Sequence, residues 1–190
     1  NMPVLDAAFF ANLCQATYRP LLIDGILRGW LIRHFANADR IQRPGLAQRI
    51  WKATDDTGID IVLIDDWKPN TMNKRPQLVI RWDDLTPKRD GIDNRFVSTG
   101  PVQVRVAPQL YANTMLGSHT IFCIAGESAE CKELAFEVYD QLMKFAPTVQ
   151  KLLNLSRMEL AKIDRPGRLE ESSENFAAPI TLAYAYGQQW

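Results

Sequence analysis

The sequence has no excess of charge of either sign. Lysine and arginine together number 22, as do aspartate and glutamate, so the formal net charge is zero. A protein that holds duplex DNA through its phosphates usually carries a basic excess. A nucleic-acid-binding module is therefore disfavoured, although a local basic patch is compatible with a neutral total.

Cysteines are few, and long apolar runs are missing. Cys14, Cys123 and Cys131 form no C-x-x-C pair and leave an odd thiol, which favours a reducing compartment over a disulfide framework. Apolar runs such as residues 61–64 are too short to span a bilayer, and no basic region followed by an apolar stretch opens the sequence. We therefore expect neither a membrane segment nor a secretory signal.

The familiar motifs of catalysis are also missing. The sequence contains no phosphate-binding loop, no dinucleotide fingerprint, no nucleophile elbow and no zinc-protease motif. Its two histidines, His34 and His119, lie at no metal-ligand spacing. We expect His34 to pack at the end of a helical stripe, and Ser118 and His119 to point to opposite faces of a strand. The sequence therefore predicts a protein that is not an enzyme and needs no cofactor or metal.

One short pattern supports an enzymatic alternative. Asp66 and Lys68 have the acid-x-lysine spacing of metal-dependent nucleases, in which the acid holds Mg²⁺ and the lysine orients water. Such a site needs a further acid from a neighbouring strand, for which Asp60 and Asp83 are candidates, and Pro69 suggests that Lys68 already lies in a loop. Because the pattern is short and common, the nuclease is the less favoured hypothesis.

The chain opens with a helical part, residues 1–52. From Pro20 onward, apolar residues recur at three and four positions and predict a helix, in which Gly25 and Gly29 either weaken the structure or let something pack closely against it. Residues 46–52 have room for one or two further helical turns.

Strands follow in the middle of the chain. Residues 59–64 read as a strand covered on both faces, residues 77–82 and 102–106 as strands, and residues 120–125 as a central strand. The polar stretch 83–94 is expected to be a loop or long hairpin tip, within an extended segment 83–115. We expect Trp51, Trp67 and Trp82 to serve the core.

The last third predicts one helix and two strands. Ser128 is expected to cap a helix that Pro147 stops, and a strand follows at residues 158–163. In the final strand, residues 178–186, large apolar side chains share one face, while small residues on the other face allow close packing by a helix or a neighbouring subunit. The prediction is a single domain over residues 1–190 of the α/β (α+β) class, with a mostly antiparallel mixed sheet covered by helices on one face.

With these elements in place, the chain resembles bacteriophage tail-terminator proteins of the neck. The resemblance lies in the segment Gly117-Ser118-His119-Thr120-Ile121-Phe122-Cys123 with the helix after it, and in the ending Pro179-Ile180-Thr181-Leu182-Ala183-Tyr184-Ala185-Tyr186. Lys74-Arg75-Pro76, which leads into an earlier strand, fits the same picture. The likeness covers roughly residues 45 to 190 and consists of element order rather than a diagnostic motif.

The resemblance implies a structural virion protein, assembled in the host cytoplasm, that forms a homo-hexameric ring at the head-proximal end of the tail tube. Such a ring stops tube growth and joins the tail to a connector or stopper on the head, with the sheath protein as a further partner in a contractile tail. DNA passes through the lumen without sequence-specific binding. The nearest alternative is another neck ring, a connector or stopper.

A ring subunit makes different contacts with its two neighbours, and extended segments outside the core are the natural places for them. We therefore expect the 83–115 segment and the C-terminal end to supply contacts to other subunits or to the tube. The residues predicted to make them are Asp84, Leu85, Thr86, Arg89, Leu110, Tyr111 and Trp190.

Overall fold

The computed structural model describes residues 19–53, 57–66, 76–88, 112–169 and 172–189 of the chain. The elements along the chain are α2 (Arg19–Phe35), η1 (Ala38–Arg40), α3 (Pro44–Ala47), β1 (Asp60–Leu63), η2 (Ile64–Asp66), β2 (Gln77–Lys88), β3 (Ala112–Ala125), α4 (Ser128–Leu152), β4 (Arg157–Ile163), β5 (Gly167–Leu169) and β6 (Ser172–Gln189). None of the helices in these ranges has the length and apolar content needed to cross a membrane.

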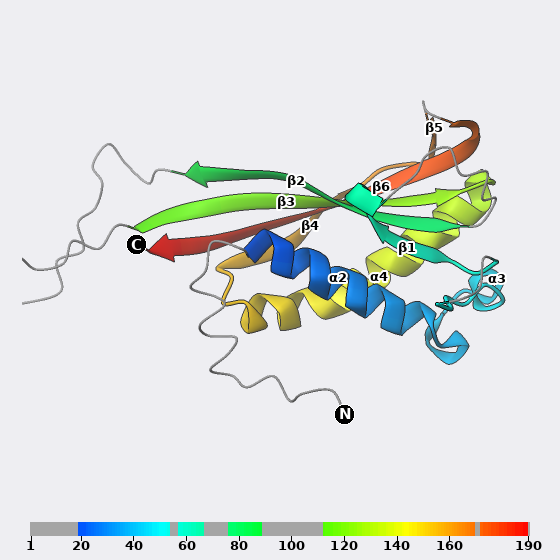
Figure 1. Cartoon of the computed structure of the whole chain (residues 1–190), viewed down its shortest axis with the longest axis horizontal. Coiled ribbons are helices and arrows are strands. Elements are labelled where there is room, and N and C mark those ends of the chain that lie inside the picture. The colour runs from blue at the N-terminus through cyan, green and yellow to red at the C-terminus, as the bar shows by residue number, and fades with distance from the viewer. Residues whose placement is uncertain (1–18, 54–56, 67–75, 89–111, 170–171, 190) are drawn as a thin grey trace, which may run out of the picture.

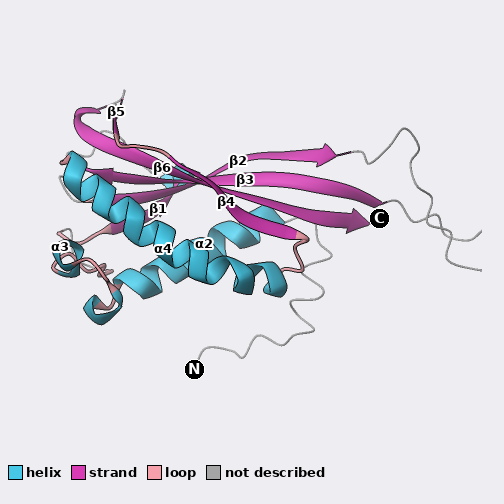
Figure 2. Cartoon of the chain, turned by 180° about the vertical axis from the view of Figure 1, so that it is seen from behind, coloured by secondary structure: helices cyan, strands magenta, loops and turns pink. Residues whose placement is uncertain are grey.

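The strands form one mixed sheet in the order β1-β2-β3-β6-β4, with β5 paired to β6. The β1–β2 pair is parallel and the other pairs are antiparallel. Helices α2 and α4 lie against the same face of the sheet (Figure 1), and the view from behind shows the same arrangement (Figure 2). The predicted fold class is confirmed, and so is the central position of residues 120–125, because they belong to β3.

The core lies between the sheet and the two long helices. The apolar stripe of α2, the apolar stripe of α4 and one face of β6 belong to a single buried cluster. Removing each such side chain from water contributes about 1.5–3 kcal/mol. The fully or almost fully buried residues that define these three surfaces are Ile23, Leu27, Leu31, Phe35, Leu134, Val138, Leu142, Ile180, Leu182, Tyr184 and Tyr186.

Helix α4 differs from its prediction at both ends. It runs through Pro147 to Leu152, so the expectation that Pro147 stops it was wrong. Pro147 is exposed, and the buried Val149 and Leu153 continue the apolar stripe beyond it, which offsets the hydrogen bond that proline cannot donate. At the start, Ser128 is the first helical residue, and Glu127 holds the cap position without a side-chain hydrogen bond.

Two expectations for the strands were also wrong. Strand β1 lies at the edge of the sheet and buries only Ile61 within its bounds, so it is not covered on both faces. Strand β2 continues to Lys88, where the sequence predicted a loop or a long hairpin tip from residue 83, because residues 84–88 pair with β3. The rest of that predicted stretch, residues 89–94, lies outside the described residues. Trp82 is 43% exposed and does not serve the core. Trp51 is partly buried against the core, and Trp67 and the predicted strand 102–106 lie outside the described residues.

The ends of three strands form what we call the arm: residues 84–88 of β2, 112–118 of β3 and 183–189 of β6. Its root still packs on α2, because Tyr184 and Tyr186 are buried and the Arg19 guanidinium of α2 lies 4.6 Å from the centre of the Tyr186 ring, and the strands continue past the helices from there. Continuous pairing joins these segments, from Lys88 opposite Thr114 to Ala112 opposite Gln189. Strands β3 and β6 contain 14 and 18 residues, where about 5–6 is usual. Figures 1 and 2 show the three strand ends projecting beyond α2 and α4.

Candidate functional surfaces

The arm carries the first candidate surface. Strand β1 pairs only with the stretch of β2 from Gln77 to Ile80, so within the described chain no strand pairs with the outer edge of β2 beyond it. An unpaired edge offers backbone donors and acceptors to another chain. Trp82 and Leu116 add apolar area at exposed fractions of 43% and 40%. Among the described residues, the arm therefore combines an open strand edge with an exposed leucine on its length and an exposed tryptophan at its base.

Polar side chains fix the base of the arm. Ser118 donates a hydrogen bond from Oγ to Oδ1 of Asp84, and Thr120 donates one from Oγ1 to Oδ2 of Asp83. Nε1 of Trp82 donates to the carbonyl oxygen of Asp84 at 2.9 Å, at the point where the β2–β3 register shifts. Strand β2 carries charged residues such as Asp84 and Lys88, and also Pro87, along this edge. Charges and a proline on an edge strand discourage indiscriminate strand pairing, so this edge suits a specific partner.

The structure places some of the predicted contact residues and not others. Asp84, Leu85 and Thr86 lie on β2 within the arm, and Asp84 and Thr86 are exposed while Leu85 is partly buried. The other predicted contact residues lie outside the described residues: Arg89, Leu110, Tyr111 and Trp190.

The second candidate surface is a pocket of about 440 Å³ on the sheet face that α2 and α4 leave open. Its floor comes from neighbouring strands and includes Val79, Phe122 and Pro179, whose side chains alternate with the core-facing ones. Its other lining residues include Arg81, Arg165 and Arg168 with a single acid, Asp164. The pocket is thus an apolar floor with a cationic rim.

Two of the pocket arginines, Arg81 and Arg168, are positioned by different contacts within the chain. Nε of Arg81 lies 2.7 Å from Oδ1 of Asp83, and its guanidinium stacks 4.7 Å from the centre of the Phe122 ring. The guanidinium of Arg168 lies 5.9 Å from the centre of the Phe176 ring. An apolar floor beside guanidinium groups suits a hydrophobic side chain flanked by carboxylates.

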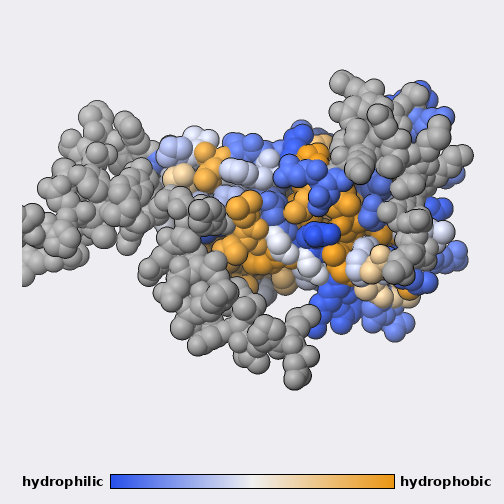
Figure 3. All heavy atoms as spheres, viewed as in Figure 1, coloured by the Kyte–Doolittle hydropathy of each residue, from blue (hydrophilic) through white to orange (hydrophobic). Residues whose placement is uncertain are grey.

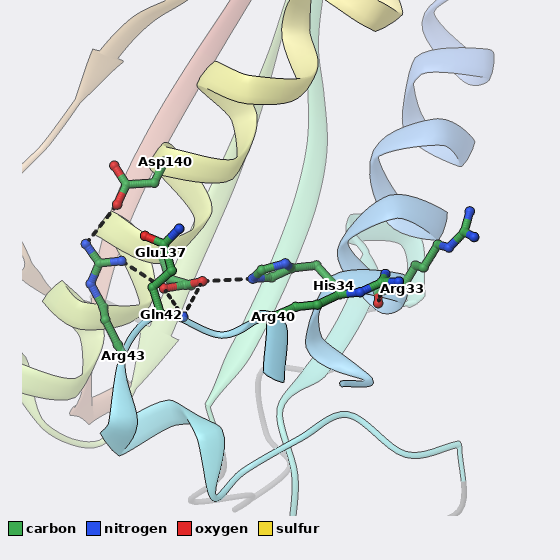
Figure 4. A network of polar contacts seen from close by, with 7 residues as sticks. All are labelled: Arg33, His34, Arg40, Gln42, Arg43, Glu137 and Asp140. Atoms are coloured by element: carbon green, nitrogen blue, oxygen red, sulfur yellow. Dashed lines mark hydrogen bonds and ion pairs between the residues drawn. The ribbon is translucent and has the colours of Figure 1, made fainter. Parts of the chain in front are cut away.

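The third candidate region is a network of polar side chains between α2 and α4, built around one buried carboxylate (Figure 4). Glu137 is fully buried, and its Oε1 lies 2.8 Å from Nε2 of His34. Its Oε2 accepts from Nη1 of Arg43 at 2.8 Å, and the backbone N–H of Gln42 donates to the same carboxylate at 3.2 Å. Arg43 also reaches Asp140 at 3.1 Å.

This network ties the segment after α2 to α4. Burial lowers the pKa of Arg43, but its hydrogen bonds and charge interactions with Glu137 and Asp140 outweigh that effect and raise it. His34 packs at the end of the α2 stripe, as the sequence predicted, but it is almost fully buried where a half-buried side chain was expected. Glu137 was missed, although a glutamate between Leu134 and Val138 on the apolar side of α4 is the kind of position that signals a buried carboxylate.

A basic cleft of about 300 Å³ adjoins the network. Arg33, Arg40 and Lys144 line it together with His34 and Trp30. Nη1 of Arg40 donates to the backbone oxygen of Arg33 at 3.1 Å, and the Trp30 ring stacks on Phe145 with 4.6 Å between centroids. The cleft concentrates positive charge locally in a chain that is neutral overall.

A second buried polar group anchors α2 to the root of the arm. Nε2 of His119, fully buried, lies 3.0 Å from Oδ1 of Asp24 on α2, without the alignment of a hydrogen bond. The hydroxyls of Tyr184 and Tyr186 are buried nearby and have no hydrogen-bond partner in the described chain. Burial raises the pKa of Tyr184, and Tyr186 and Asp24 raise it further.

The position of His119 agrees with the sequence interpretation. Its side chain faces the helices, and Ser118 faces the open side, where it reaches Asp84. The two side chains therefore cannot exchange a proton. The interaction with Asp24 could not be read from the sequence, because the two residues lie far apart in the chain.

The outer side of α2 is unusually apolar for a surface helix. Leu21 is 58% exposed, and a Cβ atom added at Gly25 or Gly29 would meet nothing within 4 Å. Figure 3 shows hydrophobic surface gathered around the middle of the side on which α2 lies. Arg28 and Arg33 are also exposed on this helix, so the surface is apolar with cations.

The nuclease hypothesis assumed that Asp66 and Lys68 share one face of a strand. Asp66 lies in the short helix η2 and not on a strand, and Lys68 lies outside the described residues. Asp60 lies on β1 and Asp83 on β2. Among the described residues, no group of three histidines, cysteines or acids is placed to hold a metal ion.

Comparison of the sequence with protein-family models gives no match, and comparison with curated proteins gives none either. Function must therefore be inferred from the resemblance in element order and from the surfaces of this chain.

Proposed function

We propose that this chain is the subunit of a homo-hexameric ring that terminates the tail tube of a long-tailed bacteriophage and joins it to the head. The observation that carries the proposal is the arm. It projects beyond the helices with an open β2 edge and with Trp82 and Leu116 exposed at its base and on its length. Such a feature costs solubility in a solitary domain and is useful in a subunit that pairs with neighbours.

A closed ring needs two different surfaces on each subunit, one for each neighbour. The arm supplies one candidate surface, and the body supplies others on both sides of the sheet. In this proposal the protein works through surfaces complementary to the tube protein below and to the connector or stopper above, with the sheath as an added partner in a contractile tail. DNA passes through the lumen without being read, and the protein is located in the virion neck.

The proposal is tested by measuring mass and shape with and without the tube protein of the same phage. The expected result is a discrete hexamer, visible as rings in negative-stain micrographs, and tubes whose growth stops when the chain is added. Tubes that reach the same length with and without the chain, together with a subunit that stays monomeric beside them, would contradict the proposal.

Variants of the arm sharpen this test. Leu116→Asp places a charge on the exposed part of β3 in the arm, and Leu152→Asp places the same charge at the end of α4, where the exposed fraction is similar, 42% against 40%. We expect Leu116→Asp to reduce ring formation or tube capping and Leu152→Asp to leave both unchanged. Equal behaviour of the two variants would remove the arm from the contact surfaces.

A further inference from the structure

The pocket on the open sheet face is built like a receptor for a hydrophobic side chain flanked by acids. Val79 and Phe122 on its floor belong to central strands, yet neither α2 nor α4 covers this face, and Ile64 of the short helix η2 only lines the pocket. Apolar sheet faces are normally buried against a second layer. Small residues on β6, Thr181 and Ala183, continue the same face toward the arm and leave room for close approach.

The opposite side of the molecule exposes a surface of matching chemistry. Phe136, on the side of α4 away from the sheet, is 40% exposed, which is unusual for an aromatic side chain in the middle of a helix. Its partners within the chain are Arg43 and Lys132, at 5.9 Å and 5.7 Å from the ring centre. Four acids lie in the N-terminal half of α4 or just before it: Glu127, Glu130, Glu133 and Asp140. Glu130 pairs with Arg49 and Asp140 with Arg43.

We propose that the open-face pocket of one subunit receives Phe136 and the acidic N-terminal half of α4 from a second copy of the chain. The inference rests on the proposed ring and names one of its subunit contacts. The pocket lies on one face of the sheet, lined by side chains that alternate with the core-facing ones. Helix α4 lies on the opposite face (Figures 1 and 2). A contact between opposite faces repeats from head to tail and closes when the rotation between subunits allows it.

Charge decides between the two helices that could fill the pocket. The outer side of α2 is also apolar, but it exposes Arg28 and Arg33, which would face the pocket arginines. The surface around Phe136 also carries cations, Arg43 and Lys132, but there the acids outnumber them. Glu133 on α4 and Glu127 just before it are exposed and would face the pocket arginines with opposite charge. Like charges across an interface are costly and opposite charges fix the register, so α4 is the occupant that the chemistry selects.

The test uses one variant on each side of the contact. Phe136→Arg removes the ring and sets a cation against Arg165 and Arg168, while Glu133 and Asp140 at helical spacing accommodate the new side chain within the subunit. Arg168→Glu reverses the pocket side. The matched controls are Leu152→Arg on the same helix, 42% exposed, and Arg157→Glu, whose 64% exposed side chain lies outside the pocket lining.

Association is measured by analytical ultracentrifugation, alone and with the tube protein, after circular dichroism shows that each variant is folded. We expect both contact variants to weaken association by roughly 30-fold or more, the effect of a central hot-spot residue, and both controls to assemble like the original chain. Mixing Phe136→Arg with Arg168→Glu should restore association to at least a dimer, because the pocket of the first variant and the Phe136 surface of the second form one intact contact.

The possible results distinguish failure of this subunit contact from failure of the proposed ring. If rings persist in both contact variants, or if the mixture gives no dimer, the inference is overturned while the ring stands. Capture of a tube-protein peptide by the pocket in place of α4, seen as loss of tube binding in Arg168→Glu with rings intact, also overturns it. If the original chain never associates, even beside the tube protein, the proposed function falls and takes this contact with it.

Discussion

Replacing Glu137 by alanine removes the central acceptor of the network between α2 and α4. His34, 5% exposed, loses its partner at 2.8 Å, and the Gln42 N–H loses both carboxylate oxygens. Each buried donor left without a partner costs about 1–3 kcal/mol, and breaking a buried ion pair costs about 3–5 kcal/mol. Arg43 is 25% exposed and keeps Asp140, so we expect the low end, about 3 kcal/mol.

The measurement is the free energy of unfolding in urea, with the slope of the transition unchanged. Glu133→Ala is the matched control, because Glu133 lies on the same helix about one turn earlier and is exposed. An exposed substitution of this kind changes stability by no more than about 0.5 kcal/mol. If Glu137→Ala also changes the free energy by less than that, the network does not stabilise the fold and the reasoning is refuted.

Three further predictions concern other parts of the fold. Gly117→Ala should destabilise the chain by about 1–3 kcal/mol, because the new Cβ would lie 2.5 Å from the Tyr184 ring. Gly29→Ala should stabilise it by about 1 kcal/mol, because a Cβ there meets nothing within 4 Å and alanine favours a helix over glycine. Thermal unfolding of both variants tests this. Burial raises the pKa of Tyr184, so the folded state holds this proton to higher pH than the unfolded state. Its contribution to the free energy of unfolding is therefore fully present below about pH 10 and falls as the pH rises further. If a Tyr184→Phe variant loses as much stability as the original chain between about pH 10 and 11, this loss does not come from Tyr184. Burial raises the pKa of Cys131 to about 11 and that of Cys123 well above its usual range, so a thiol reagent at pH 8 should label both only on unfolding; labelling of either in the native protein would show that it is accessible.

The elements with strong periodicity could be predicted from the sequence. Spacings of three and four residues placed α2 and α4, and the alternation along residues 178–186 assigned the correct side chains of β6 to the core. The predictions that failed were those on ends and edges. Pro147 did not stop α4 because buried residues beyond it continue the stripe, and β2 continued past residue 83 because β3 pairs with it. Pairing partners distant in the chain decide such boundaries.

For the candidate surfaces, too, local sequence patterns predicted one part and contacts between distant residues decided the rest. Composition, charge balance and periodicity by themselves determined an α+β domain with one helix-covered sheet face, since these depend on local spacing and on apolar content. The burial of Glu137 beside His34, the pairing of His119 with Asp24, and the meeting of Arg81 and Arg168 around one apolar floor were decided only by the tertiary structure. Each joins residues from elements far apart in the chain, and no local pattern encodes the distance between them.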